Sequence, residues 1–438
     1  MPRYVYHPHH SDIPSTADVV IIGGGPAGAA ALWALHELDP ALKVVLIERA
    51  DQLASGSSTA SLENFRTCWP TACIAHQCAE SIHVYLHADE FIGEGAKQAI
   101  QPKVRGYLFC GFNSTQAEQL RADVEHLHTA GLIHIEYHET PALHERFPWL
   151  DRSVIAAKYD PQAGWLDSYG LVSAYAKAAE HALVLLGVEG VTICHSGGRI
   201  VGVQWARGQI QTERVILANG AGAVVTASLS GLSLPVVLRP RQSFTTDFRH
   251  EPFPADAPML ISAVPHPHVR PEAGSSAIFG WEYQWYSGQH DTNGRPLDAL
   301  TEPHPNLSAL KDPRFPSITL ALLARHFGHT ATGFADGRYL RGIRHNIGYY
   351  VYRDATAAYT VAPDGTHTPY TSERAILDQH PDVQGLFLSV AHSGHGIMTS
   401  AAAGRIVARH TLGMTLHDPL YEQFRISAHW VEHDENAL

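Results

Sequence analysis

The sequence predicts an α/β fold built on parallel strands, in a chain long enough for two domains. The apolar run VVII at 19–22 leads through a glycine-rich turn into the alanine-rich stretch PAGAAALWAL, which is the order of a buried strand and its helix. Similar strand–glycine junctions recur at 214–223 and 386–396. The chain has 438 residues, of which 45% are hydrophobic, and this is enough to bury two cores.

Charge and composition argue against several other classes of protein. The net charge of −12 disfavours a nucleic-acid partner. The uncharged run from Val19 to Leu35 is short for a membrane span and is interrupted by glycines, and no apolar signal segment precedes it, so we expect a cytoplasmic protein. Five scattered cysteines and thirty histidines show neither a disulfide framework nor the spacing of metal ligands, so we expect no metal site.

The first junction carries the motif G-x-G-x-x-G. Gly23 permits a tight turn after the strand, Gly25 lets the backbone approach a pyrophosphate, and Gly28 lets helix and strand pack closely. Pro26 and Ala27 open the helix, whose first N–H groups and dipole favour an anion. These residues predict the phosphate-binding turn of a dinucleotide site.

A second strand supports the same interpretation. KVVLIER at 43–49 ends in Glu48 and Arg49, and Glu48 stands twenty residues after Gly28 (48 − 28). An acidic side chain at this place accepts hydrogen bonds from ribose hydroxyls. The two strands together predict a bound dinucleotide.

The later junctions bear on which dinucleotide is bound. A predicted hairpin at 198–213 precedes the strand that ends near Gly220 and Gly222. Near the C-terminus, LFLSVA is a predicted strand, SGHG at 393–396 a tight turn, and TSAAAGRIVARHTL a helix. A NAD domain would place such junctions in one contiguous half of the chain, so their spread favours FAD.

In these motifs the chain resembles the D-amino acid oxidase, glycine oxidase and sarcosine oxidase family of flavoproteins, from about Asp18 to about Gly413. The order and spacing are most similar to sarcosine oxidase-like members and to the mitochondrial FAD-dependent oxidoreductase domain proteins. The matching segments are GGGPAG with Glu48–Arg49, ASGSSTASLENFR (54–66), GYLFCG (106–111), YDPQAGWLDSYGLVSAYAKAA (159–179), RVILANGAGA (214–223) and SGHGIMTSAAAG (393–404).

The resemblance implies a fold of mixed α/β and α+β class, in which a Rossmann-like FAD-binding domain carries an inserted mixed-sheet substrate domain. The FAD-binding domain is then expected at 15–100, 158–232 and 375–425, and the substrate domain at 101–157 and 233–374. Beyond the glycine motif and Glu48–Arg49, the expected FAD contacts are Ser57, Ser58, Ser61, Val191, Gly220, Gly222, Gly394, His395, Gly396, Ile397 and Met398.

The resemblance also implies the chemistry. Such enzymes pass a hydride from the carbon beside an amine to flavin N5, and water hydrolyses the resulting imine. Reduced flavin carries negative charge, which the N–H groups of the turn at 393–396 and the following helix are suited to stabilise. His395 either contacts the flavin or packs behind it, and the sequence leaves both open.

Two arginines are candidates for holding a substrate carboxylate, because the planar guanidinium binds both oxygens. Arg66 falls where sarcosine oxidase-like members hold the carboxylate, and Arg344 resembles the G-x-R of glycine oxidase-like members. A surface salt bridge is the alternative for each. Tyr349 and Tyr350 are candidate polar groups above the flavin, and no general base is identified.

Three departures from the family pattern matter. Gly348 stands where sarcosine oxidases attach flavin to a cysteine, so FAD is expected to be non-covalent. Met398 stands where sarcosine oxidases have a lysine that helps to bind the carboxylate, and Ile278 where they have one that helps O2 to react. Rapid reaction with O2 is therefore not implied, and the electron acceptor can be O2 or another molecule. Amine or amino-acid oxidation is the favoured function, with 2-hydroxy acid dehydrogenation and a non-catalytic, flavin-loaded assembly factor as alternatives.

Overall fold

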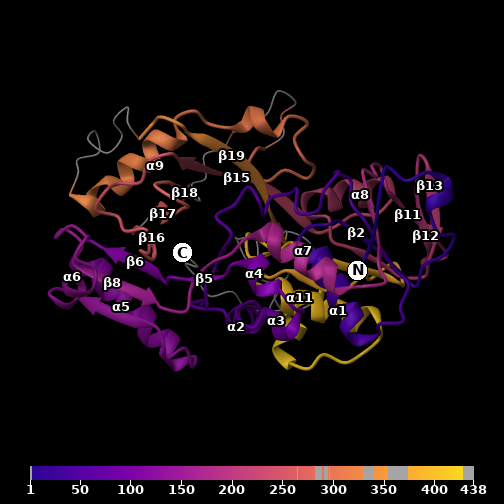
Figure 1. Ribbon diagram of the computed structural model, residues 1–438, viewed down its shortest axis with the longest axis horizontal. Coiled ribbons are helices and arrows are strands. Elements are labelled where there is room, and N and C mark those ends of the chain that lie inside the picture. The colour runs from indigo at the N-terminus through magenta and orange to yellow at the C-terminus, as the bar shows by residue number, and fades with distance from the viewer. Residues whose placement is uncertain are drawn as a thin grey trace.

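The computed structural model describes residues 2–263, 265–281, 289–290, 294, 296–328, 339–353 and 373–427. These residues form two large β-sheets that lie toward opposite ends of the molecule, each with its own helices (Figure 1). The predicted mixed α/β class is confirmed. Several parts of the expected substrate domain, of which the longest are 282–288, 329–338 and 354–372, lie outside the described residues.

The first large sheet is parallel except for one edge strand. Its order is β1 (Arg3–Tyr6), β10 (Leu183–Leu186), β3 (Val44–Ile47), β2 (Val19–Ile22), β14 (Val215–Leu217), β21 (Leu386–Val390) and β20 (Ile376–Gln379). Only β20 runs antiparallel to its neighbour. The four strands predicted from apolar runs are all confirmed, and they lie next to one another in this sheet. Strands β1 and β10 complete one side and were not predicted.

Strand β2 is buried on both faces, as its continuous apolar sequence requires. Val19 and Ile21 face a layer of helices, whereas Val20 and Ile22 face a three-stranded antiparallel sheet. The helices are α1 (Pro26–Leu38), α2 (Ala72–Leu86), α3 (Ala88–Phe91), α4 (Ala96–Ile100), α7 (Ser168–Ala178) and α11 (Ser400–Thr411). The small sheet comprises β11 (Thr192–Ser196), β12 (Arg199–Trp205) and β13 (Gly208–Gln211), and α8 (Ala223–Leu229) packs against β11. The predicted hairpin is β12–β13.

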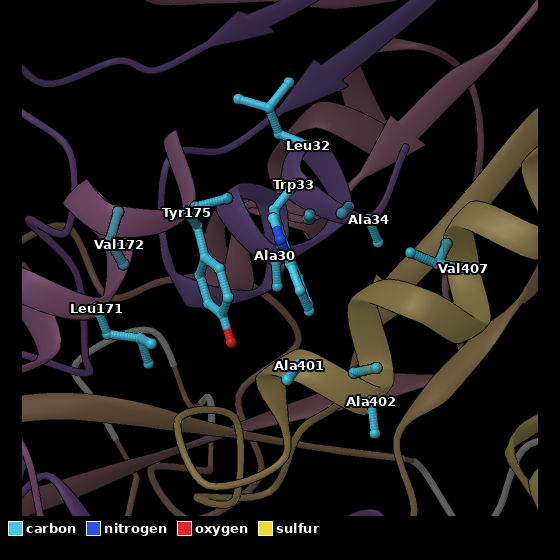
Figure 2. Packing of buried hydrophobic residues seen from close by; sticks show 14 of the residues in the cluster. Ala30, Leu32, Trp33, Ala34, Leu171, Val172, Tyr175, Ala401, Ala402 and Val407 are labelled. Carbon is cyan, nitrogen blue, oxygen red and sulfur yellow. The ribbon is translucent and has the colours of Figure 1, made fainter. Parts of the chain in front are cut away.

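Helices α1, α7 and α11 pack tightly because their contact faces are rich in small residues. Figure 2 shows Trp33 of α1 beside Tyr175 of α7, with ring centroids 5.1 Å apart. Gly404 of α11 lies directly against the backbone of Ala30 in α1, where an added Cβ would come within 2.5 Å of the Ala30 carbonyl. Helix α1, which begins at the glycine turn, is therefore fixed by direct contact with α11.

Replacing Gly404 with valine is expected to destabilise the protein by about 3 kcal/mol, because the clash is with backbone that has no room to move. Urea denaturation at fixed FAD concentration measures the loss. Arg409→Val places the same β-branched residue on a more exposed position of α11 and is expected to cost under about 1 kcal/mol. Equal losses in the two variants would show that close packing at Gly404 is not the cause.

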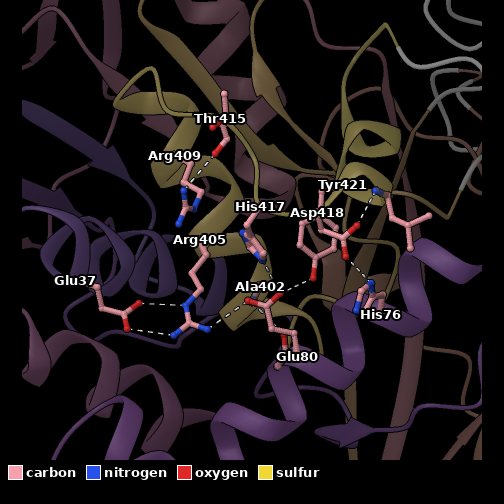
Figure 3. Close-up of polar contacts among 12 residues, drawn as sticks. Glu37, His76, Glu80, Ala402, Arg405, Arg409, Thr415, His417, Asp418 and Tyr421 are labelled. Carbon is pink, nitrogen blue, oxygen red and sulfur yellow. Dashed lines mark hydrogen bonds and ion pairs between the residues drawn. The ribbon is translucent and has the colours of Figure 1, made fainter.

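Charged side chains join α11 to both neighbouring helices (Figure 3). Arg405 pairs with Glu37 of α1 at 3.1 Å and with Glu80 of α2 at 3.3 Å. Glu80 also accepts a hydrogen bond from Tyr421 near the end of the described chain. This network ties the C-terminal segment to the helices around the glycine turn.

The second large sheet is antiparallel except for the parallel pair β16–β6. Its order is β19 (Arg344–Arg353), β15 (Val236–Thr246), β18 (Ala277–Trp281), β17 (His268–Pro271), β16 (Met259–Ile261), β6 (Tyr107–Gly111), β8 (Ala156–Asp160) and β7 (Glu136–Glu139). Helices α5 (Ser114–Thr129), α6 (Ala142–Arg146) and α9 (Phe315–Leu323) belong to this half. The expected boundary at 157/158 falls inside β8.

A minimal third sheet lies between the two large ones. It contains β4 (Asn64–Phe65), β9 (Gly164–Trp165) and β5 (Lys103–Val104), and Figure 1 shows β5 between the two halves. Strand β4 carries the residue that precedes Arg66. Among the described residues, no helix is both long enough and apolar enough to cross a membrane.

Candidate active site

The three motif glycines have distinct structural roles. Gly23 has φ +114°, and a Cβ there would lie 2.6 Å from the Cα of Asn219, which follows β14. A Cβ on Gly28 would lie 1.9 Å from the carbonyl oxygen of Gly23. A Cβ on Gly25 would meet no atom within 4 Å. The first and third glycines therefore serve packing, whereas the second leaves open space before the N-terminus of α1, as a pyrophosphate site requires.

Glu48 lies at the C-terminal end of β3 and is almost fully buried. Its Oε2 accepts the N–H of Gly24 at 2.7 Å, and its Oε1 accepts the N–H of Ala50 at 2.9 Å. The carboxylate thus fixes the glycine turn, and each oxygen keeps a further acceptor position for a hydroxyl. Arg49, the next residue, is exposed.

The other residues expected at the adenosine half also lie at the ends of strands in this sheet or beside it. Gly220 and Gly222 form the short 3₁₀ turn η2 (Gly220–Gly222) that follows β14, and Gly220 has φ +54° with open space before it. Val191 is buried immediately before β11. Pro26 and Ala27 are the first two residues of α1, and no side chain caps that helix in the part of the chain that the structure describes.

The turn that follows β21 is confirmed and has an unusual backbone. Ala391, Ser393 and Gly394 all have positive φ. Ser393 is anchored by its N–H, which donates to the carbonyl of Val351 in β19 at 2.9 Å. A Cβ on Gly394 would lie 2.5 Å from the ring of Tyr350, so glycine is needed for this close approach. The turn is therefore held against a strand of the second sheet.

Beyond the turn, Gly396, Ile397 and Met398 lead into α11. The Tyr85 hydroxyl donates to the carbonyl of Ile397 at 2.7 Å and bonds to Ser400 Oγ at 2.9 Å. This contact connects α2 to the segment between the turn and the helix. It fixes the position of residues that line a cavity.

That cavity has a volume of ≈ 680 Å³ and lies between the turn at 393–398, the segment at 61–69 and strands of the second sheet. Arg66 places a cation on the wall of this cavity, and the residue is 3% exposed. The guanidinium carbon lies 3.7 Å from the centre of the Trp69 ring and 5.6 Å from that of Phe109. Stacking on aromatic faces holds a buried cation in one orientation.

Asp160 fixes the segment that presents Arg66. This fully buried carboxylate accepts the N–H groups of Thr67 at 3.0 Å and Cys68 at 3.2 Å, and the Thr67 hydroxyl at 3.1 Å. This role of Asp160 was not predicted, because Asp160 lies in β8, far from Thr67 in the chain. Trp69 is close to Arg66 in the chain, but its stacking on the guanidinium was not predicted either.

The preceding loop, which contains the predicted serines, is bonded to both halves of the protein. Ser57 Oγ accepts the N–H of Tyr349 in β19 at 3.1 Å, and Ser61 donates to the carbonyl of Ser58 at 2.6 Å. Glu63 accepts a hydrogen bond from Ser168 of α7. Ser57 and Ser61 line a second cavity of ≈ 400 Å³ that adjoins the first.

Arg344 lies apart from these residues. Its side chain is 69% exposed and pairs with Asp247 at 3.4 Å, and it lines neither cavity. Tyr349 lines the smaller cavity, and its hydroxyl accepts the N–H of His304 at 2.8 Å. Tyr350 lines both cavities. The structure therefore brings Arg66, Tyr350 and the turn together, and leaves Arg344 on the surface.

His395 belongs to the turn and lines the same cavity as Arg66. Its ring centroid is 4.1 Å from that of Trp69, and its Nε2 is 3.6 Å from the carboxylate of Glu373. Burial, reinforced by the charge of Arg66, lowers the pKa of His395 to about 3. The ring is therefore neutral at pH 7, and its contact with Glu373 is not an ion pair.

Burial also lowers the pKa of His326 to about 3, and the pKa of His268 and of His392 to about 4. Since an unfolded histidine titrates near pH 6.5, the unfolded chain takes up protons between pH 6.5 and 4 that the native chain does not. The free energy of unfolding is therefore expected to fall as the pH is lowered through this range. His326→Gln should reduce the slope of the unfolding free energy against pH by about 1.4 kcal/mol per pH unit. Urea denaturation at several pH values measures this slope. An unchanged slope would show that the pKa of His326 is not lowered by burial.

A parallel sheet whose first buried strand leads through a glycine turn into a helix is the fold of a dinucleotide-binding protein. The chain belongs to the FAD-dependent oxidoreductase family (DAO), whose model matches residues 18–410. Its cofactor is FAD. The expected family and cofactor are thus confirmed.

Among curated proteins, the chain is 23% identical to FAD-dependent oxidoreductase domain-containing protein 1 of Xenopus laevis, over 90% of this chain and 79% of that protein. It is 26% identical to mitochondrial sarcosine dehydrogenase of Mus musculus. That match covers 51% of this chain and 25% of the dehydrogenase. Among solved structures, L-proline dehydrogenase of P. horikoshii has a TM-score of 0.71 at 20% identity, with 95% and 98% of the two chains covered. Glycine oxidase of Bacillus cereus has a TM-score of 0.67 at 17% identity, with 92% and 97% covered. These structural similarities establish the fold.

Proposed function

We propose that the protein oxidises a small amino acid, or another small amine that carries a carboxylate, at its carbon–nitrogen bond. The observation that carries the proposal is Arg66, a buried cation in a cavity that adjoins the turn at 393–396. A guanidinium in such a place binds a carboxylate through two hydrogen bonds. Bound FAD supplies the acceptor of the two electrons removed from the substrate.

Three groups of residues in the chain would hold the parts of FAD. The turn at Gly23–Gly28 and the N-terminus of α1 would hold the pyrophosphate, Glu48 would accept the ribose hydroxyls, and the turn at Ser393–Gly396 would lie beside the ring system. The open space before Gly25 and the unused acceptor positions of Glu48 support this assignment. We propose non-covalent binding and the division into a discontinuous FAD-binding domain and an inserted substrate domain, with β1 belonging to the first.

The names of the relatives support the substrate class. Sarcosine dehydrogenase, L-proline dehydrogenase and glycine oxidase are each named for an amino acid. A substrate with a carboxylate next to its amine could bind through that carboxylate to the buried guanidinium of Arg66. Arg344 has no part in the proposed site, because it is exposed and paired with Asp247.

An anaerobic titration of the purified holoenzyme tests the proposal. D- and L-amino acids, N-methylglycine, simple amines and 2-hydroxy acids are added singly while the visible absorbance of the flavin is recorded. We expect one class of amino acids to abolish it, and readmitted air then shows whether O2 is the acceptor. Loss of absorbance only with 2-hydroxy acids would replace the proposal with hydroxy-acid oxidation. No loss with any compound would favour a non-catalytic role.

A further inference from the structure

His268, in β17, lines both cavities and keeps one ring nitrogen unprotonated. Its Nδ1 lies 3.0 Å from the carbonyl oxygen of His266. A carbonyl only accepts hydrogen bonds, so Nδ1 carries the proton and Nε2 keeps its lone pair. Burial lowers the pKa of His268 to about 4, so this tautomer is neutral at pH 7.

The neighbouring strand leaves room for this ring. His268 pairs with Gly280 of β18, and a Cβ on Gly280 would lie 2.2 Å from His268 Nε2. His268 lines both the larger and the smaller cavity, and it shares the larger one with Arg66. The imidazole thus forms part of the wall between the two spaces, with its ring position dependent on a glycine.

An amino acid presents two recognition groups, a carboxylate and the N–H bonds of its nitrogen. The larger cavity offers a cation for the first at Arg66 and a hydrogen-bond acceptor for the second at His268. The Glu63 carboxylate on the same wall already accepts from the N–H and hydroxyl of Ser168, and burial raises its pKa.

Resting on the proposed function, we propose that His268 is a specificity-determining residue whose Nε2 accepts a hydrogen bond from the substrate N–H while Arg66 holds the carboxylate. An ether of the same shape would place an oxygen lone pair against the nitrogen lone pair. The site should therefore select amines over isosteric ethers, because an unmet buried acceptor is costly.

Matched ligand pairs provide the test. Methoxyacetate is N-methylglycine with an ether oxygen in place of the amine nitrogen. Tetrahydro-2-furoate is related to L-proline in the same way. In His268→Leu holoenzyme we expect kcat/KM for whichever amine is oxidised to fall about 10- to 100-fold, the equivalent of a hydrogen bond to a charged group. The inhibition constant of the matching ether should not rise, because the ether never made that bond and leucine removes the opposed lone pair. His268→Gln, which retains an acceptor, should recover part of the loss.

His326→Gln is the matched control. His326 is also buried, its Nδ1 bonds to a backbone carbonyl at 3.0 Å, and it lines neither cavity. It should keep the wild-type kcat/KM, and FAD content per chain reports folding of each variant. If His268→Leu does not retain FAD, the comparison of His268→Gln with Gly280→Ala decides, because the added Cβ displaces the ring and should reduce amine kcat/KM more than the glutamine does.

The outcomes separate the two proposals. If no amine is oxidised by the wild-type enzyme, the proposed function fails. If amines are oxidised but His268→Leu weakens amine and ether equally, or neither, the role of His268 is overturned while the function stands.

Discussion

Arg66→Met is expected to lower kcat/KM for the amino-acid substrate by about 100-fold or more. Removing one partner of a buried, hydrogen-bonded charge pair costs about 2–5 kcal/mol, and each 1.4 kcal/mol is a factor of ten. Methionine keeps much of the side-chain volume against Trp69, so the cavity wall should persist. Anaerobic stopped-flow measurement of flavin absorbance at increasing substrate concentration gives the constant.

Arg344→Met is the matched control, because the same substitution is made at an arginine that is exposed and paired with Asp247. Its kcat/KM should remain within about twofold of wild type. Arg66→Lys keeps the charge but loses the planar guanidinium, so its kcat/KM should lie between those of Arg66→Met and Arg344→Met. Unchanged kcat/KM in Arg66→Met would place the carboxylate site elsewhere.

Gly25→Val is expected to yield a folded protein that does not retain FAD. The Cβ itself meets no atom within 4 Å, so the chain should accommodate it, but the branched side chain would occupy the space proposed for the pyrophosphate. FAD content per chain after gel filtration should fall at least about tenfold relative to wild type, equivalent to about 1.4 kcal/mol or more of binding free energy.

Gly28→Val separates the two roles of the glycine motif. Its Cβ would clash with the Gly23 carbonyl at 1.9 Å, so this variant should lose the fold as well as FAD. Circular dichroism and thermal unfolding of the apo forms distinguish the variants. An FAD-loaded Gly25→Val protein would show that the pyrophosphate does not approach this turn.

Much of the first sheet was predictable because its signals are local. VVII, VVLI, VIL and LFLSV are unbroken apolar runs beside glycines, which is the pattern of parallel strands buried on both faces. Strand β1, RYVY, is largely exposed at the sheet edge and gives no such signal. It is a strand because β10, nearly 180 residues later in the sequence, offers it a partner.

The candidate site was predictable only where the side chain of a single residue indicates a function, as an arginine indicates carboxylate binding. Arg66 was singled out as a possible carboxylate ligand, and the structure places it in a cavity. Asp160, which holds the segment next to Arg66, acts through a contact between residues 93 apart in the sequence, and no local pattern reveals it. Trp69 lies only three residues from Arg66, but the spacing alone does not predict that the two side chains stack. Arg344 had a comparable sequence pattern, yet its position at the start of β19 leaves it on the surface. His268 was only one of the thirty histidines of the chain.

The order of strands in the first sheet has a consequence for biosynthesis. Strand β14 lies between β2 and β21, and β21 is made about 170 residues after β14. Until the ribosome has released residues 386–390, β14 presents an unpaired hydrogen-bonding edge, a surface that promotes aggregation. A nascent chain that stalls in the second half of the message therefore exposes the middle of its nucleotide-binding sheet. Chaperones that bind unpaired strands are therefore expected to contact the nascent chain during that interval.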